Sequence, residues 1–351
     1  MTEAMKSFSE ASRLNVLFLP LYSMQGASSR YRVYHYADRL PSHGFDVKIL
    51  HPRSYTLASK ALYILSLPKA LRWADVVVIQ KKLFRSPLYA LIRHLNNAVV
   101  FDFDDALYVD NSITNMLSHV LRTSRHVIVG NRHLENFARR FTDRVTRIPT
   151  PVDVQAFTPA DKKCLVNDVI TIGWIGAGGN LIYLEHLEPV FERIYLSKGQ
   201  TVQLKVISDR TFRFRSCRLP VVNIPWSLST ELEALRSLDI GIMPLTDDEL
   251  SRGKCAFKVL QYMSVGIATV ASSVGMNREV IHHLGNGMLA TSLEEWRCAL
   301  LHLIENPALR EQFGREARKT VEYEYSYEVT TPHLASVLKS VAVQKQRRLP
   351  P

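Results

Sequence analysis

The sequence lacks the features of a membrane-spanning or secreted protein. No apolar run reaches the roughly 18 residues that a transmembrane helix needs. Residues 1–10 are polar and hold no apolar segment of the kind found in secretory signals. The four cysteines have neither zinc-site nor disulfide-framework spacing: they are Cys164, Cys217, Cys255 and Cys298. We therefore expect a protein of the reducing cytoplasm.

Internal repeats and low-complexity stretches are also absent, which argues against a solenoid. The histidines show no metal-site spacing, so we expect no metal. The chain has 351 residues, more than a usual single domain, and its hydrophobic content of 46% is ample for two cores. These observations favour a globular protein of two domains.

Acidic residues are scarce in the first part of the chain. Residues 1–155 carry 21 Lys and Arg against 12 Asp and Glu, whereas the remaining residues carry 23 against 21. This imbalance predicts an anionic partner for the first part. No nucleic-acid-binding signature accompanies the charge, so anionic lipid or a polyprenyl phosphate fits better. Residues 60–93 mix apolar and basic side chains as a surface on lipid headgroups does. The alternative is an ordinary amphipathic helix with a solvated basic rim.

Short β-rich runs alternate with helical patterns along the whole chain. The predicted strands are 14–19, 45–50, 75–80, 98–101 and 126–129, then 169–175, 202–207, 221–224, 239–243 and 268–271. Helices are expected over 29–42 and 307–343, and the tail 344–351 is expected to be disordered. The alternation predicts βαβ units and a parallel sheet on either side of Pro149 and Pro151.

Ligands of open α/β sheets bind beyond the carboxyl ends of strands. In the first half, Gly26 and Arg30 follow the first strand, and Asp102, Asp104 and Asp105 follow the fourth. Carboxylates so close together repel one another, so a cation, a hydroxyl group or a helix N-terminus is expected to use them. Either Asp104 or Asp105 is a candidate general base. The alternative is helix capping and solvation.

Residues 253–277 form the most informative segment of the second half. Their pattern predicts a helix, a glycine turn, a buried strand and a second turn. Lys254, Lys258 and Gln261 fall at i, i+4 and i+7 and form one polar stripe from the helix N-terminus. Two ammonium groups beside a positive helix end favour a phosphate anion. The alternative is a solvated Lys-rich face.

This segment resembles the donor-binding signature of GT-B glycosyltransferases of family four (group 1). The matching residues are Lys254, Phe257, Leu260–Met263, Gly266, Val270–Ser272 and Val274-Gly275. Further matches are Arg30, Leu40, Gly44, residues 127–131, Ile148-Pro149, Pro151–Asp153, Phe157 and residues 239–244. The pattern GKxxxKxLQYM resembles a subgroup found among bacterial polysaccharide enzymes.

The chain departs from the family at the two glutamates that usually stand seven residues apart. Lys254 and Gln261 occupy those positions. Gln261 can still hydrogen-bond a ribose hydroxyl, whereas Lys254 only donates. The family's Arg and Lys after the first strand of the second domain are also absent, and a glycine-rich turn stands there. We infer that Lys254 and Lys258, with Arg252, neutralise the diphosphate instead.

The resemblance implies an α/β, GT-B-like fold. Two Rossmann-type parallel-sheet domains would face each other across a cleft, with C-terminal helices crossing back. Residues 1–150 would form the acceptor domain and 151–325 the nucleotide-sugar donor domain, followed by a crossing helix and basic tail at 326–351.

The implied activity is transfer of a sugar from a nucleotide-diphosphate donor to a hydroxyl of a glycan or lipid-linked acceptor. The setting would be bacterial cell-surface polysaccharide synthesis in the cytoplasm, at the inner face of the membrane. Retention of configuration and independence from cofactors and metals are also implied. The donor would be bound by Gly176, Gly178, Trp226, Arg252, Lys254, Lys258 and Gln261. The acceptor would be bound by Gly26, Arg30 and Asp102, with Asp104, Asp105 and Lys258 as catalytic residues.

Three alternatives remain open. The missing glutamates favour a catalytically silent GT-B-like protein that binds glycan or a partner transferase. A sugar-nucleotide epimerase would convert its donor without an acceptor. A dinucleotide oxidoreductase is disfavoured because residues 173–179 do not have the G-x-G-x-x-G spacing.

Overall fold

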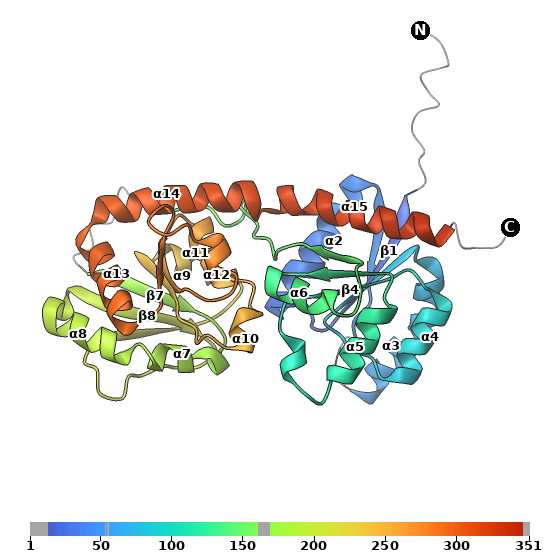
Figure 1. The fold of residues 1–351 in the computed structure, drawn as a ribbon, viewed down its shortest axis with the longest axis horizontal. Coiled ribbons are helices and arrows are strands. Elements are labelled where there is room, and N and C mark those ends of the chain that lie inside the picture. Colours follow the sequence, from blue (N-terminus) through green and yellow to red (C-terminus); the bar gives the residue numbers. More distant parts are fainter. Residues whose placement is uncertain (1–12, 53, 55, 161–168, 347–351) are drawn as a thin grey trace, which may run out of the picture. The chain divides into compact units, whose positions relative to one another are not determined.

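The computed structural model describes residues 13–52, 54, 56–160 and 169–346 (Figure 1). The chain forms two compact units. The first unit comprises Met1–Thr150 and Glu328–Pro351, and the second comprises Pro151–Tyr327. The chain therefore returns to the first unit after completing the second. The assignment of acceptor and donor roles to these units stays a prediction.

The first unit contains a parallel sheet in the order β2-β1-β3-β4-β5-β6. Its strands are β1 (Leu14–Pro20), β2 (Phe45–Ile49), β3 (Val76–Gln80), β4 (Val99–Phe103), β5 (His126–Val129) and β6 (Val145–Arg147). Its longer helices are α3 (Leu57–Trp73), α4 (Ser86–Leu95), α5 (Thr114–Thr123), α6 (Arg132–Arg139) and α15 (Tyr327–Gln346), with a short turn η4 (Leu107–Val109). Residues 344–346 of the predicted disordered tail belong to α15, which corrects that part of the prediction, and 347–351 lie outside the described residues.

The helical segment after β1 is less regular than the sequence predicts. It consists of α1 (Ala27–Ser29), the π-helix η2 (Arg30–Tyr34), α2 (His35–Arg39) and the 3₁₀ turn η3 (Leu40–His43). A π-helical turn places an extra residue in the turn and often lies at a functional site. Here it allows Arg30 and Arg32 both to be buried. The segment ends at Gly44, whose φ of 90° is a left-handed conformation that glycine adopts without strain.

The second unit contains a parallel sheet in the order β12-β11-β10-β7-β8-β9, the strand order of a dinucleotide-binding domain. Its strands are β7 (Ile170–Ile175), β8 (Val202–Ser208), β9 (Val221–Pro225), β10 (Ile240–Met243), β11 (Ala268–Ser272) and β12 (Met288–Ala290). The helices are α7 (Ile182–Glu185), α8 (Glu188–Lys198), α9 (Glu231–Arg236), α10 (Glu249–Arg252), α11 (Phe257–Ser264), α12 (Asn277–Val280), α13 (Leu293–Glu305) and α14 (Pro307–Glu324). Two 3₁₀ turns, η6 (Gly178–Asn180) and η7 (Gly199–Thr201), complete the unit.

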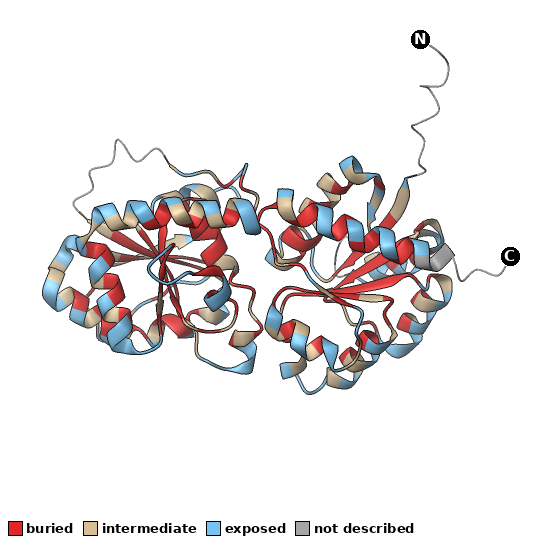
Figure 2. Ribbon diagram, turned by 45° about the horizontal axis from the view of Figure 1, so that its top comes forward, coloured by how far each residue is buried: buried red, intermediate tan, exposed pale blue. Residues whose placement is uncertain are grey.

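Each sheet is buried on both faces by helices (Figure 2). Strands of this kind carry continuous apolar runs rather than alternating ones, and all residues of β3 and β11 are buried. The core of the second unit is built around Trp174 and Phe191, both almost fully buried. The runs predicted from sequence are confirmed as strands, and the structure adds the three-residue strands β6 and β12.

The strand order creates one topological switch point in each unit, where connections leave neighbouring strands in opposite directions. In the first unit it lies between β1 and β3, and in the second between β7 and β10. Segments that follow these strands are therefore brought together at the carboxyl edge of the sheet.

We predict that Gly314→Ala destabilises the second unit. A Cβ at Gly314 of α14 would lie 2.1 Å from the carbonyl oxygen of Gly266, too close for backbone to accommodate. The free energy of unfolding measured in urea should fall by about 1–3 kcal/mol, although alanine is the better helix former. Gly179→Ala is the matched control, because its Cβ meets nothing within 4 Å. Equal effects of both changes would contradict this packing.

Candidate functional site

The glycine-rich turn after β7 leaves room for a neighbouring lysine side chain, and two of its amide groups are hydrogen-bonded within the protein. The Gly176 N–H donates to the carbonyl of Ile207 at 3.0 Å, and the Gly178 N–H donates to Asp209 Oδ1 at 2.6 Å. These bonds fasten the turn to the end of β8. The amide groups of Gly176 and Gly178 are thus already engaged. A Cβ at Gly176 would lie 2.6 Å from Lys258 Cε, so glycine leaves room for this lysine.

Lys254 and Lys258 both lie beside this turn. Lys258 Nζ is 5.4 Å from the centre of the Trp174 ring, at the end of β7. Lys254 Nζ donates to Asn180 Oδ1 at 3.3 Å and lies 5.9 Å from the centre of the Tyr183 ring. Both side chains are half-buried. The two cations therefore converge on the edge of the switch point between β7 and β10.

The helix that carries this signature begins later than the sequence predicts. α11 starts at Phe257, and Ala256 before it has a left-handed φ of 50°. Lys254 therefore lies in the loop before the helix and is not part of a helical stripe. The prediction of one polar helix face is wrong, although the loop still brings Lys254 to the same turn as Lys258.

Arg252 is paired within its own segment. Its Nε lies 2.6 Å from Asp247 Oδ1, and its Nη1 lies 3.4 Å from Glu249 Oε1. These carboxylates balance the guanidinium charge locally. Arg252 is therefore a weaker candidate than the two lysines, and its contribution to a diphosphate site stays a prediction.

A buried carboxylate joins two of the predicted donor residues. Glu231 Oε1 accepts hydrogen bonds from Trp226 Nε1 at 2.9 Å and from Gln261 Nε2 at 3.1 Å. Glu231 and Gln261 are each 4% exposed, whereas Trp226 is half-buried. The indole is thus not a core tryptophan, and Glu231 fixes its orientation. Sequence reasoning missed Glu231 because a first-turn acid of a helix ordinarily serves the helix dipole.

In the first unit, Asp104 and Asp105 share one cation. Lys81 Nζ lies 3.2 Å from Asp104 Oδ1 and also pairs with Asp105. Ser28 Oγ donates to the Asp104 carboxylate at 2.8 Å. Burial opposes ionisation of Asp104, but Lys81, Arg32 and the serine outweigh it and hold its pKa below the ordinary value. A lowered pKa makes Asp104 a weaker base, and Asp105 is the better candidate because its carboxylate is half-exposed and can reach an acceptor.

Asp102 is engaged by Arg32 of the π-helical turn η2. Arg32 Nε donates to Asp102 Oδ2 at 2.8 Å, and a second guanidinium nitrogen pairs with Oδ1. Arg32 Nη1 also donates to the Ile148 carbonyl at 3.0 Å and to Thr150 Oγ1 at 3.1 Å. Asp102 thus holds this arginine, and its binding of an acceptor stays a prediction.

Burial disfavours the charged form of both Arg32 and Asp102, and it raises the pKa of Asp102 although Arg32 opposes this shift. Arg32 and Asp102 are each at most 4% exposed. Burial disfavours the charged guanidinium, but the Asp102 carboxylate outweighs this and raises the pKa of Arg32. The pair fastens the π-helical turn to β4 and to the end of the first unit's sheet.

Gly26 and Arg30 lie on the same side of this unit, after β1. The Gly26 N–H donates to the Ser23 carbonyl at 3.0 Å, and a Cβ there would lie 2.4 Å from Tyr22 Cβ. Arg30 is 1% exposed, and its guanidinium carbon is 4.9 Å from the centre of the Tyr31 ring. Acceptor binding by Gly26 and Arg30 stays a prediction.

A chain of hydrogen-bonded polar side chains links Ser29 to Asp104. Ser29 Oγ donates to Gln80 Oε1 at 2.6 Å, Gln80 Nε2 donates to Ser28 Oγ at 2.8 Å, and Ser28 reaches Asp104. Lys81, next to Gln80, has a left-handed φ of 56°, which is uncommon for a residue with a side chain. The position of Gln80-Lys81 at a strand end was the sequence signal for these residues.

Two further features bear on binding. Within the described residues, no group of three or more His, Cys, Asp or Glu side chains is placed to hold a metal ion. The predicted independence from metals and cofactors stays a prediction.

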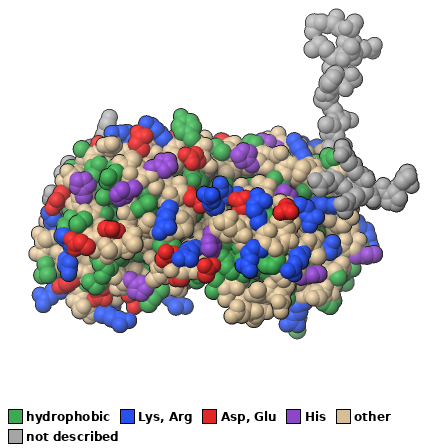
Figure 3. Space-filling view, viewed as in Figure 1, with side chains coloured by type: hydrophobic (Ala, Val, Ile, Leu, Met, Phe, Trp, Pro, Cys, Tyr) green, Lys and Arg blue, Asp and Glu red, His purple; other side chains and the backbone are tan. Residues whose placement is uncertain are grey.

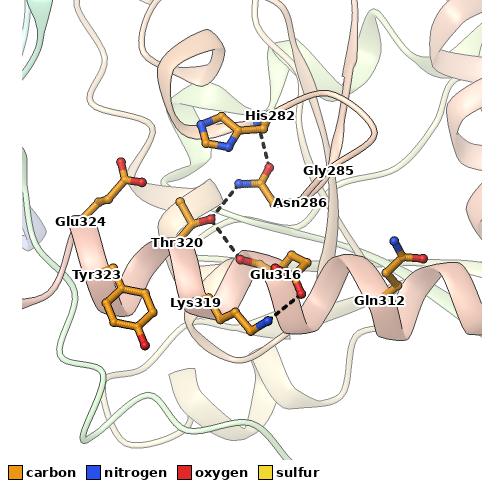
Figure 4. Close-up of a pocket in the computed structure, with 9 residues that line it drawn as sticks. All are labelled: His282, Gly285, Asn286, Gln312, Glu316, Lys319, Thr320, Tyr323 and Glu324. Carbon is orange, nitrogen blue, oxygen red and sulfur yellow. Dashed lines mark hydrogen bonds and ion pairs between the residues drawn. The ribbon is translucent and has the colours of Figure 1, made fainter.

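A cavity of about 500 Å³ lies between α14 and the turn at His282–Asn286 (Figure 4). It is lined by polar side chains, with Asn286 donating to Thr320 Oγ1 at 3.0 Å, and contains none of the predicted site residues.

The fold is that of the GT-B glycosyltransferases. A sucrose-phosphate synthase from Thermosynechococcus elongatus matches with a TM-score of 0.71 and 12% identity, covering 95% of this chain and all of its own. Anabaena HepE, in complex with UDP and glucose, matches with a TM-score of 0.70 and 12% identity over 93% of this chain and 100% of HepE. A glycosyltransferase from Rickettsia africae matches with a TM-score of 0.70 and 15% identity, covering 94% and 99% of the two chains.

Residues 187–306 match the model of the family "Glycosyl transferases group 1". No curated protein sequence matches the chain. The predicted resemblance to group 1 glycosyltransferases is thus confirmed for this stretch, which contains Glu231, Lys254, Lys258 and Gln261, and the predicted fold is confirmed by the structural matches.

We predict that Arg32 and Asp102 are strongly coupled. Arg32→Met leaves a buried carboxylate unpaired and should lower the free energy of unfolding by about 3–5 kcal/mol. The double variant Arg32→Met/Asp102→Asn should lose less stability than the sum of the two single variants, because neither of its new side chains is charged and no unpaired charge is left buried. Urea unfolding of the four proteins measures the coupling. Additive effects would contradict a structural ion pair.

Proposed function

We propose that the protein is a glycosyltransferase that moves a sugar from a nucleoside-diphosphate donor to an acceptor hydroxyl. The observation that carries the proposal is the convergence of Lys254 and Lys258 on the turn after β7. This turn adjoins the switch point of a dinucleotide-type sheet, where ligands of such sheets bind. The family match over residues 187–306 and HepE's complex with UDP and glucose support the same reading.

In this proposal the second unit binds the donor. Lys258 and Lys254 stabilise the charge that develops on the leaving diphosphate. The half-buried Trp226 stacks on the nucleobase, and its indole is held by Glu231. Glu231 also orients Gln261. The Glu231 carboxylate accepts hydrogen bonds from the ribose hydroxyls, and the Gln261 amide can both donate to them and accept from them. The carboxylate lost from position 261 is thereby supplied by a residue 30 positions earlier in the chain.

The first unit provides the acceptor side of the proposed reaction. Asp105 is the residue best suited to accept the proton of the acceptor hydroxyl: Lys81 pairs with both carboxylates, but Asp105 is half-exposed, whereas Asp104 is buried and also accepts from Ser28. The proposed acceptor is a lipid-linked glycan, and the proposed setting is bacterial cell-surface polysaccharide synthesis at the inner face of the membrane. The proposed stereochemical course is retention, as in the family that the sequence resembles.

A catalytically silent GT-B-like protein is the second candidate. It is favoured by Lys254 in place of a glutamate and by the engagement of Gln261 with Glu231. Such a protein would bind a glycan or a partner transferase without releasing nucleoside diphosphate from any donor.

We predict that Lys258 determines diphosphate binding. Thermal-shift titration of the purified protein with UDP, GDP, ADP, dTDP and CMP should show stabilisation by one nucleoside diphosphate. Lys258→Ala should weaken that affinity by about tenfold or more, since a phosphate contact is lost. Arg252→Ala is the matched control because it removes the same charge from a locally paired residue, and it should change the affinity by less than about threefold. No stabilisation by any nucleotide would refute donor binding.

We predict that Glu231 recognises the ribose. Wild-type protein should bind the preferred nucleoside diphosphate at least about tenfold more tightly than its 2′-deoxy or 3′-deoxy analogue. Glu231→Gln should lose most of this preference while retaining the response to the diphosphate. Titration calorimetry measures both affinities, and Glu233→Gln on the exposed side of α9 serves as the control. An unchanged preference in Glu231→Gln would exclude this role.

A further inference from the structure

Helix α3 of the first unit carries large apolar side chains on the side that faces away from its sheet. Leu57, Leu62 and Leu65 are 86%, 68% and 76% exposed. The opposite side of the helix packs inward through Tyr63, Leu67 and Leu71, all buried. The helix is therefore apolar on two sides, whereas a helix on the surface of a soluble domain is usually apolar on one.

The exposed residues have the spacing of an amphipathic helix of their own. Ala58, Ala61, Leu62 and Leu65 fall at i, i+3, i+4 and i+7, and all four are exposed. This outer stripe is not required for packing of the described part of the first unit, whose residues leave it exposed. An exposed patch of this kind marks an interaction surface.

Basic side chains continue the outer stripe. Lys69 and Arg72, both exposed, lie four and seven residues after Leu65 on the same side of the helix. Between residues 57 and 95 there are seven Lys and Arg but one acidic residue, Asp75. Asp75 is turned toward the sheet, where its Oδ2 accepts from the Asn15 N–H at 2.8 Å. Lys and Arg are also spread over the face of the first unit visible in Figure 3.

We propose that the outer stripe of α3 docks the protein onto an anionic lipid bilayer. The stripe is defined by Ala58, Ala61, Leu62, Leu65, Lys69 and Arg72. Its leucines would enter the boundary between headgroups and acyl chains, and its Lys and Arg would contact the anionic headgroups. Among the described residues, no helix is long and apolar enough to cross a bilayer.

The charge favours lipid over a second copy of the chain. A symmetric pairing of two such stripes would bring the basic side chains of one copy toward those of the other, and like charges repel. An anionic bilayer instead neutralises all of them at once. The inference does not depend on the proposed glycosyl transfer, since neither donor nor acceptor takes part in the binding.

The test is sedimentation of the full chain with vesicles of phosphatidylcholine alone and of phosphatidylcholine with phosphatidylglycerol. We expect at least about tenfold stronger partition to the anionic vesicles, weakened by salt. Leu62→Ser/Leu65→Ser should reduce that partition about tenfold or more. Leu196→Ser is the matched control, because this leucine of α8 in the second unit is 75% exposed and should change nothing.

A second variant tests insertion directly. Leu65→Trp should gain fluorescence quenching by lipids brominated on their acyl chains, relative to wild-type protein. No vesicle binding, or equal binding by wild type and Leu62→Ser/Leu65→Ser, would overturn the proposal. Lipid-free self-association that is lost in the double variant would also overturn it and identify the stripe as a contact between copies. All these measurements are made without nucleotide sugar, so they stay informative if the protein transfers no sugar.

Discussion

The strand order of the two parallel sheets is the constraint on which every candidate site residue depends. Loops that leave neighbouring strands in opposite directions at a switch point open the sheet's carboxyl edge to a ligand. In the second unit this edge receives the turn after β7 and the segment before α11, which together bring Lys254 and Lys258 to one place. In the first unit it receives the turns after β1, β3 and β4, which place Ser28, Lys81 and Asp104 in contact.

Local pairing then decides which charged side chains remain suited to a ligand. Arg252 is balanced by Asp247 and Glu249, and Arg32 by Asp102. The half-buried lysines lie against aromatic rings and an amide, contacts that orient an ammonium group. A diphosphate brought to this edge would therefore meet two positive charges. Asp104 and Asp105 both pair with Lys81, but Asp105 is half-exposed, whereas Asp104 is buried and also accepts a hydrogen bond from Ser28.

Local sequence signals predicted most of the fold and part of the site. Buried parallel strands are continuous apolar runs, so their positions are visible in the sequence, whereas the three-residue strands β6 and β12 are too short to give such a signal. The pairing of Arg252 with Glu249 at i,i+3 was readable as a local ion pair. Contacts between distant residues were not readable: Arg32 and Asp102 are 70 positions apart, and Glu231 and Gln261 are 30 apart. The left-handed Ala256 that displaces Lys254 from α11 likewise depends on tertiary packing.

The most direct test of the account is release of nucleoside diphosphate from sugar donors. Purified protein would be incubated with UDP-, GDP- and ADP-hexoses and a bacterial lipid-linked glycan fraction, and the products would be followed by NMR. The account predicts that one donor yields nucleoside diphosphate together with a new glycosidic bond of the donor's anomeric configuration, and that Lys258→Ala abolishes both. Binding of a donor without any release or transfer would contradict catalysis and establish the silent GT-B-like protein instead.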